Sequence, residues 1–126
     1  MATDPSNPKS DRLPTYAAFW PYYLQEHRKT ATRAVHYVGT VGVFGFLFAA
    51  IALRRPLYLA CMPLCGYGFA WFSHFFIEKN RPATFTYPLW SLGSDFRMFF
   101  LAASGKLGPH LRAAGIGAAE ASQPAI

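Results

Sequence analysis

Two apolar segments decide the fold, AVHYVGTVGVFGFLFAAIAL at residues 34–53 and PLYLACMPLCGYGFAWFSHFFI at residues 56–77. Only Arg54 and Arg55 separate them. A helix of about 20 apolar residues is about 30 Å long, which matches the hydrocarbon thickness of a membrane. The sequence therefore predicts two transmembrane helices, and the short connection makes them antiparallel.

The composition favours a membrane protein over a soluble helical bundle. Hydrophobic residues make up 52% of the 126 positions and charged residues 14%. A soluble hairpin needs a polar face on each helix, and neither segment has one. The net charge of +6 comes from cations that flank the apolar segments, a placement suited to anionic lipid headgroups rather than to nucleic acid. These cations are Arg28, Lys29, Arg33, Lys79, Arg81 and Arg97.

More Lys and Arg residues lie near the two termini than in the turn between the apolar segments, so the positive-inside rule places both termini in the cytoplasm. We therefore expect a multi-pass integral membrane protein that contacts membrane lipids. Its membrane is the bacterial inner membrane or, in a eukaryote, the endoplasmic reticulum.

Three regions are predicted along the chain. Residues 1–14 are expected to form a flexible tail, 15–103 a membrane-embedded helical domain, and 104–126 a loose tail rich in Ala and Gly. Before the first apolar segment, an aromatic stretch predicts a short helix at headgroup level. After the second, residues 87–103 predict an interfacial or re-entrant helix. The fold class is all-α, a membrane helical hairpin of two transmembrane helices with flanking interfacial or re-entrant helices.

Small residues within the apolar segments indicate close helix packing. Gly39, Gly42 and Gly45 repeat every three residues, a spacing that lets helix backbones approach each other. Cys61 and Cys65 lie on one face of the second segment. Two positions on one helix are poorly placed for a disulfide, so we interpret these cysteines as packing residues.

Histidines mark one level of the predicted hairpin. His36 lies 19 residues before Arg55 and His74 lies 19 residues after it, so the two imidazoles are expected at equal depth. His27 ends the preceding surface helix, and Glu78 follows His74 by one helical turn on the same face. Three imidazole or carboxylate ligands with open positions are typical of non-haem iron(II) oxygenases. Any three of these four side chains can form such a face.

Two acidic residues and the fourth histidine are judged from their positions in the sequence. Glu26 and Asp95 are candidates for orienting a metal-bound imidazole, since such rings donate their second N–H to a carboxylate or carbonyl. His110 lies in the predicted loose tail beside Pro109, and we leave it out of the site.

Four blocks of the chain resemble the small membrane family of 2-hydroxy fatty acid dioxygenases. They are YLQEH at residues 23–27, RAVHYVGT at 33–40, HFFIEKNRPA at 74–83 and GSDFRM at 93–98. Ser73 departs from the pattern, because a glycine commonly precedes this histidine in the family. The stretch 29–32 also lacks the Asn and Pro that many members have there.

The resemblance implies an iron(II)-dependent dioxygenase. Its substrates are a 2-hydroxy fatty acid and O2, and it converts the fatty acid to the acid one carbon shorter with release of CO2 (α-oxidation). The positions matching the iron ligands are His27, His36 and His74. We add Glu78 and Asp95 as catalytic candidates. Arg81 and Arg97 are candidates for binding the substrate carboxylate through a charge-assisted pair.

Two other classes of function remain as alternatives. Histidines at matched depth on antiparallel helices also suit a haem with two axial imidazoles, although an interfacial depth and an extra carboxylate argue against it. The second alternative is a structural membrane hairpin without chemistry, which bound-iron measurements distinguish from an enzyme.

Overall fold

The computed structural model describes residues 13–117, and within them every regular element is a helix. The elements in chain order are α1 (Tyr16–Gln25), α2 (Thr30–Ala52), α3 (Leu57–Phe72), the π-helix η2 (Ser73–Glu78), the 3-10 helix η3 (Ala83–Phe85), α4 (Pro88–Ala103) and α5 (Leu107–Ala113). The all-α class is therefore confirmed. Most of the predicted N-terminal tail and residues 118–126 lie outside the described residues.

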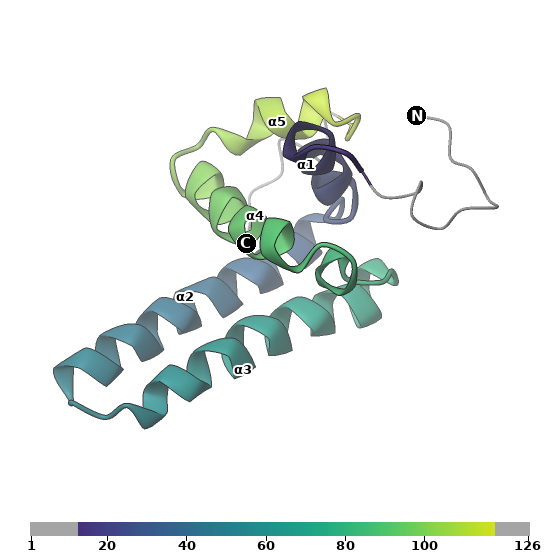
Figure 1. The fold of residues 1–126 in the computed structure, drawn as a ribbon. Coiled ribbons are helices and arrows are strands. Elements are labelled where there is room, and N and C mark those ends of the chain that lie inside the picture. Colours follow the sequence, from purple (N-terminus) through teal and green to yellow (C-terminus); the bar gives the residue numbers. More distant parts are fainter. Residues whose placement is uncertain (1–12, 118–126) are drawn as a thin grey trace.

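Helices α2 and α3 run side by side as an antiparallel arm, and the other helices gather around one end of it (Figure 1). The chain turns at Arg54, whose φ of 53° is left-handed, and the Arg55 amide then donates to the Ala50 carbonyl at 3.0 Å. Both arginines are exposed at the tip of the arm. The predicted hairpin is thus present in the fold.

Among the described helices, only α2 is long and apolar enough to cross a membrane by length and composition. It has 23 residues, and 28% of its most apolar stretch is buried inside the protein. The two predicted spans are therefore reduced to one candidate span. The second helix of the hairpin, α3, is too short for a span. It has only 16 residues before the backbone widens into the π-helix η2 at Ser73.

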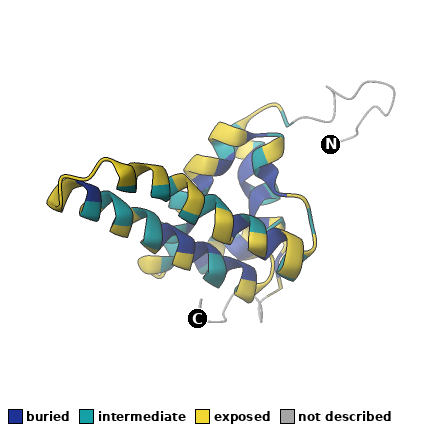
Figure 2. Ribbon diagram, turned by 90° about the horizontal axis from the view of Figure 1, so that it is seen from below, coloured by how far each residue is buried: buried dark blue, intermediate teal, exposed yellow. Residues whose placement is uncertain are grey.

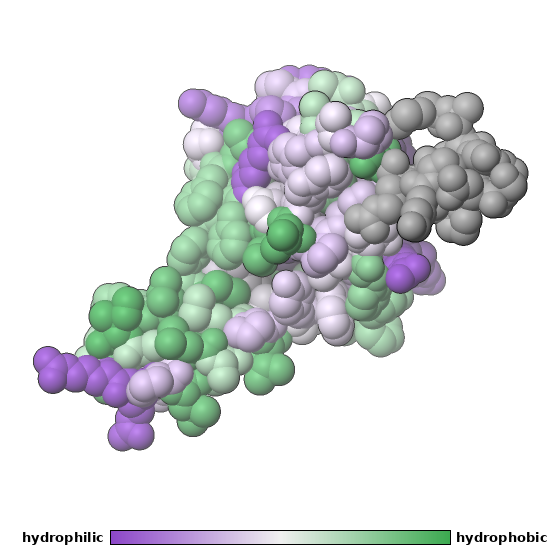
Figure 3. All heavy atoms as spheres, viewed as in Figure 1, coloured by the Kyte–Doolittle hydropathy of each residue, from purple (hydrophilic) through white to green (hydrophobic). Residues whose placement is uncertain are grey.

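The outer surface of the arm is apolar. Phe48, Leu57 and Leu64 are 74%, 76% and 75% exposed, and hydrophobic residues cover the arm up to its hydrophilic tip (Figure 3). Buried residues concentrate instead where the arm joins the other helices (Figure 2). The core that positions the polar residues therefore lies at the base of the hairpin.

Helices α1, α4 and α5 form this core. Phe19 and Tyr23 of α1 and Met98 of α4 are fully buried. Leu107 and Leu111 of α5 join the same cluster, although they lie in the region expected to be a loose tail. Because these two leucines are four residues apart, they lie on one face of α5, and this face packs against the core cluster. Helix α5 is therefore part of the body that supports the arm.

The three glycines of α2 differ in how closely the neighbouring helix approaches them. A Cβ at Gly39 would lie 2.9 Å from the Cβ of Phe69, which cannot move without the backbone of α3. One at Gly42 would lie 2.3 Å from the Sγ of Cys65, which can rotate away, and one at Gly45 would meet no atom within 4 Å. Close approach of the helices therefore depends on Gly39 but not on Gly45.

This difference predicts opposite effects of two equal substitutions. Gly39→Ala is expected to destabilise the protein by about 1–3 kcal/mol, because the added methyl group forces the packed helices apart. Gly45→Ala is expected to stabilise it by about 0.5–1 kcal/mol, since alanine loses less backbone entropy in a helix. Thermal unfolding of both variants in one detergent measures the difference. Equal shifts of the unfolding temperature would contradict the packing argument.

Candidate metal centre

Three histidines from separate elements meet at the base of the hairpin. The Nε2 atom of His27 lies 3.0 Å from the Nε2 of His36 and 3.0 Å from the Nε2 of His74. The side chains are only 1%, 5% and 2% exposed. The α1–α2 connection supplies His27, the second turn of α2 supplies His36, and η2 supplies His74. The structure thus brings together the three imidazoles singled out in the sequence.

Hydrogen bonds define the tautomer of each ring. Every Nδ1 faces an oxygen that can only accept: His27 faces the Tyr23 carbonyl at 2.7 Å, His36 the Thr32 carbonyl at 3.0 Å, and His74 the Asn80 Oδ1 at 2.7 Å. Each Nδ1 therefore carries the proton. In a neutral imidazole the other nitrogen, Nε2, then has a free lone pair.

The donor set fits a metal ion. Burial, and after it the neighbouring His36 and His74, hold the pKa of His27 well below its ordinary value of 6.5, so this ring is neutral at pH 7. The Nε2 lone pair of His27 therefore faces the Nε2 lone pairs of His36 and His74 at 3.0 Å, and no proton lies between them to form a hydrogen bond. Nitrogens bound to one ion at about 2.0–2.1 Å lie about 3 Å apart at right angles. A first-row divalent cation between the rings would turn this repulsion into coordination.

Asn80 connects His74 to Glu26. Its Nδ2 donates to the Glu26 carbonyl at 3.1 Å and to the Glu26 Oε2 at 2.6 Å, which leaves Oδ1 to accept from His74. Lys79 is left-handed with φ 60°, and this turn brings Asn80 back toward the π-helix. Glu26 thus acts on His74 through the Asn80 amide. The sequence did not predict a role for Asn80, although it lies in the block at residues 74–83 that resembles the dioxygenase family.

Arg33 is a second residue that sequence reasoning missed. Its position beside an apolar segment predicts a headgroup-facing cation, but the side chain is only 2% exposed. Its Nη1 donates to the carbonyls of His27 and Arg28, both at 2.7 Å. The guanidinium therefore holds the α1–α2 connection that carries His27. Hydropathy alone does not distinguish this role from that of a flanking surface charge.

The π-helix brings Ser73 against a candidate ligand. The Ser73 hydroxyl donates to the Ala70 carbonyl at 2.6 Å, so its oxygen accepts from the His36 Nδ1 at 2.9 Å. The residue that departs from the family pattern is thus a second acceptor for His36. Short π-helical turns are rare and occur mostly at functional sites, and here the widened turn contributes both Ser73 and His74.

Glu78 caps a helix and is not part of the three-histidine group. Its Oε2 accepts from the Lys29 amide at 3.1 Å and from the Thr32 hydroxyl at 2.5 Å. Those donors belong to the first turn of α2, whose free N–H groups favour a carboxylate. The contact ties the end of η2 to the start of α2, and it holds the residue whose carbonyl accepts from His36.

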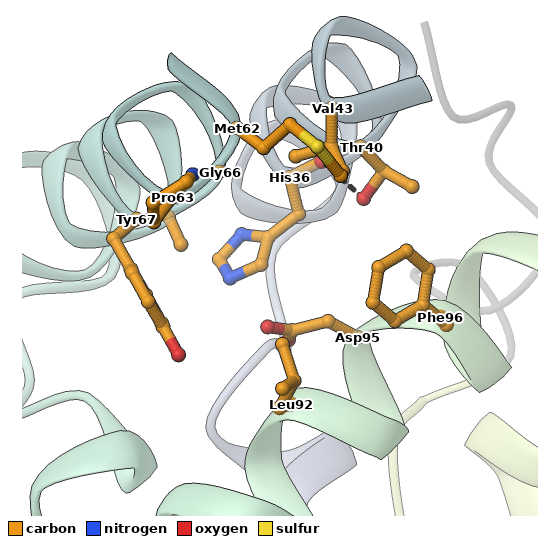
Figure 4. A pocket seen from close by; sticks show the side chains of 11 residues that line it. His36, Thr40, Val43, Met62, Pro63, Gly66, Tyr67, Leu92, Asp95 and Phe96 are labelled. Atoms are coloured by element: carbon orange, nitrogen blue, oxygen red, sulfur yellow. Dashed lines mark hydrogen bonds between the residues drawn. The ribbon is translucent and has the colours of Figure 1, made fainter. Parts of the chain in front are cut away.

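A cavity of about 290 Å³ opens beside His36. Asp95 lies in its wall with a carboxylate oxygen directed toward the imidazole (Figure 4). The Tyr23 hydroxyl donates to the Asp95 Oδ1, and the Tyr23 ring stacks on His27 with centroids 4.1 Å apart. Burial raises the pKa of Asp95 to about 7, although the Tyr23 hydrogen bond lowers it. This carboxyl therefore exists in both protonation states near neutral pH.

The two arginines predicted to bind the substrate carboxylate, Arg81 and Arg97, have their guanidinium groups over aromatic rings. The Arg97 guanidinium lies 4.1 Å from the Trp20 ring centroid, and the Arg81 guanidinium lies 5.3 Å from that of Phe85. Both arginines are exposed, and neither lines the cavity beside His36. His110 accepts from the Trp20 indole at 3.1 Å and does not belong to the three-histidine group.

Together, the fold and the site define a small helical protein with a buried three-histidine metal-type centre beside a largely apolar cavity. The sequence model of one family, described as 2-hydroxy-palmitic acid dioxygenase Mpo1-like, matches residues 13–107. The chain belongs to this Mpo1-like family. Comparison with curated proteins gives no match, and comparison with solved structures gives none either.

Proposed function

We propose that this protein is a non-haem iron(II) dioxygenase that shortens 2-hydroxy fatty acids by one carbon. The main support is a buried group of three imidazoles in which the Nε2 of His27 lies 3.0 Å from the Nε2 of both His36 and His74. Three nitrogen ligands that leave positions open are typical of iron(II) oxygenases. The description of the family, which names a dioxygenase and a 2-hydroxy acid, supports the reaction type.

The overall reaction balances without another reductant. A 2-hydroxy acid and O2 give the acid one carbon shorter, CO2 and water, and the four electrons that reduce O2 come from the two carbons of the cleaved bond. When bound, iron(II) supplies the positions at which dioxygen is activated and the 2-hydroxy carboxylate is held. His27, His36 and His74 are the residues that hold it.

The other residues orient ligands and handle the proton. The carbonyls of Tyr23 and Thr32 and the Asn80 amide oxygen fix the three rings. Asp95, in the cavity wall beside His36, accepts the proton of the substrate hydroxyl, since a carboxyl with a pKa near the working pH is an efficient base. We assign Glu78 a positioning role through Thr32, and we leave Arg81 and Arg97 outside the catalytic set.

We also propose that the α2–α3 arm inserts into a membrane. Its exposed apolar surface would contact lipid, and Arg54 and Arg55 would reach headgroups beyond the hydrocarbon layer. If the arm enters and returns, both termini lie on one side, which is the cytoplasmic side by the positive-inside rule. The three-histidine centre then lies near that face, where a fatty acid arrives from the lipid.

Spacing at the centre argues against the haem alternative. Axial ligands stand on opposite sides of the porphyrin, about 4 Å apart if each bond is about 2 Å. The haem alternative pairs His36 with His74, and the His27 nitrogen lies 3.0 Å from the Nε2 of each. The His27 imidazole therefore occupies the space that a flat macrocycle between those two rings would need.

Activity of the iron-loaded protein tests the proposal. The full chain, purified in mild detergent and supplied with ferrous iron without oxygen, is mixed with 2-hydroxypalmitate in aerated buffer. We expect the C15 acid and CO2 in equal amounts, together with O2 consumption. Palmitate, which lacks the hydroxyl group, is the matched control and should give no product. Iron-loaded protein that consumes no O2 with 2-hydroxypalmitate would reject the reaction.

A further inference from the structure

We propose that the cavity beside His36 binds the apolar tail of the ligand and that Met62 narrows its far end, where a long chain leaves. Met62 thereby limits how much of a chain the protein holds. The inference rests on the proposed function for the identity of the ligand, a fatty acid whose head lies at the histidines. The walls and dimensions of the cavity and the position of Met62 each support it.

The cavity is polar at one end and apolar along its length. His36 and Asp95 form the polar end. The remaining wall comes from the facing sides of α2, α3 and α4: Thr40, Val43, Met62, Pro63, Gly66, Tyr67, Ala70, Leu92 and Phe96. The Thr40 hydroxyl donates its proton to the His36 carbonyl at 3.1 Å, so it has no proton to donate to a ligand. A ligand with polar groups along its length would lose hydrogen bonds to water there.

The cavity has the length of a medium chain. Val43 lies two helical turns beyond His36, about 10 Å along α2. On α3 the wall runs from Ala70 back to Met62, about 12 Å. An extended chain advances about 1.2 Å per bond, as in a polypeptide backbone. About eight to ten carbons therefore fit between the histidines and the far end, and the remaining carbons of a longer chain, such as that of 2-hydroxypalmitate, extend past Met62.

Met62 occupies the position where a chain would leave the cavity. Val43 and Gly66 face each other, because a Cβ on Gly66 would lie 3.0 Å from the Val43 Cγ2. Met62 lies one turn beyond Gly66, and its side chain reaches from α3 toward Val43 and Thr40 (Figure 4). A methionine is flexible and fills irregular spaces, so its replacement by a larger rigid ring shortens the cavity.

Chain-length profiles of two tryptophan variants test this role. Met62→Trp fills the far end, whereas Leu64→Trp is the matched control on the same helix, since Leu64 is 75% exposed. Octanoate, dodecanoate and hexadecanoate displace a fluorescent fatty acid from the purified full chain in one detergent. These acids lack the 2-hydroxyl group, so binding is measured without turnover. Met62→Phe, a smaller change, replaces Met62→Trp if the latter does not fold.

We expect Met62→Trp to lower the ratio of dodecanoate to octanoate affinity by about tenfold, the effect of losing about two buried methylene groups. Leu64→Trp should leave the ratio unchanged. Equal ratios in both variants would overturn the inference, even if iron binding and turnover persist. A lowered ratio in a protein that oxidises no 2-hydroxy acid would instead leave the tail site intact and reject the proposed reaction.

Discussion

Replacement of His74 by alanine is expected to reduce bound iron to below about a tenth of the wild-type content. One of three nitrogen ligands is then missing, and loss even of an orienting partner commonly lowers metal affinity about 10–100-fold. His36→Ala should give the same result, because its Nε2 belongs to the same group. Metal analysis of the proteins after reconstitution with ferrous iron and removal of excess iron gives the comparison.

His110→Ala is the matched control for this experiment. It removes the same type of side chain from a site where the imidazole contacts the Trp20 indole at 3.1 Å. This variant should retain its iron. Full iron content in His74→Ala, or an equal loss in His110→Ala, would show that the three-histidine group does not bind the metal.

The metal-free protein is expected to lose stability as the pH falls below about 6.5. Burial, followed by the neighbouring His36 and His74, lowers the pKa of His27 in the folded state, whereas an unfolded histidine has a pKa of about 6.5. The unfolded state therefore binds the extra proton. The stabilising contribution of neutral His27 is complete above the unfolded pKa and decreases by up to about 1.4 kcal/mol per pH unit below it.

Thermal unfolding between pH 7.5 and 5 measures this slope. His27→Gln removes the titrating group, so the pH dependence of stability should decrease by the equivalent of about one bound proton. Bound zinc should protect the wild type, because the metal occupies the lone pair that would otherwise be protonated. An unfolding temperature that stays constant to pH 5 in the metal-free wild type would contradict the buried neutral state.

The distance along the chain from the turn predicted where His36 and His74 meet, whereas hydropathy predicted two membrane spans where only one described helix, α2, is long and apolar enough. His36 and His74 are each 19 residues from Arg55, and their ring centroids lie 5.0 Å apart. Equal arms of a hairpin meet at one level even though Pro63 and the π-helix interrupt the second arm. The π-helix also limits α3 to 16 residues. Hydropathy alone does not show where an α-helix becomes a π-helix.

Residues that orient the three imidazoles were harder to predict than the imidazoles themselves. Asn80 contacts His74 only because Lys79 adopts a left-handed conformation, with φ 60°, which nothing in that position of the sequence requires. Arg33 resembles any flanking cation until its partners, the carbonyls of His27 and Arg28, are known. Both contacts arise from tertiary structure, whereas the meeting of His36 and His74 follows from their equal distances from the turn between the two apolar segments.

The burial of the three imidazoles has a consequence for how an ion enters and leaves. The rings are only 1–5% exposed, and the cavity beside His36 is too small for a bulky chelator. Transfer of a bound ion to such a chelator would require local opening of the surrounding helices, so the opening rate would limit exchange however weak each bond is. A metal bound as proposed would then exchange slowly, and reconstitution of the purified protein would need an incubation long enough for this opening.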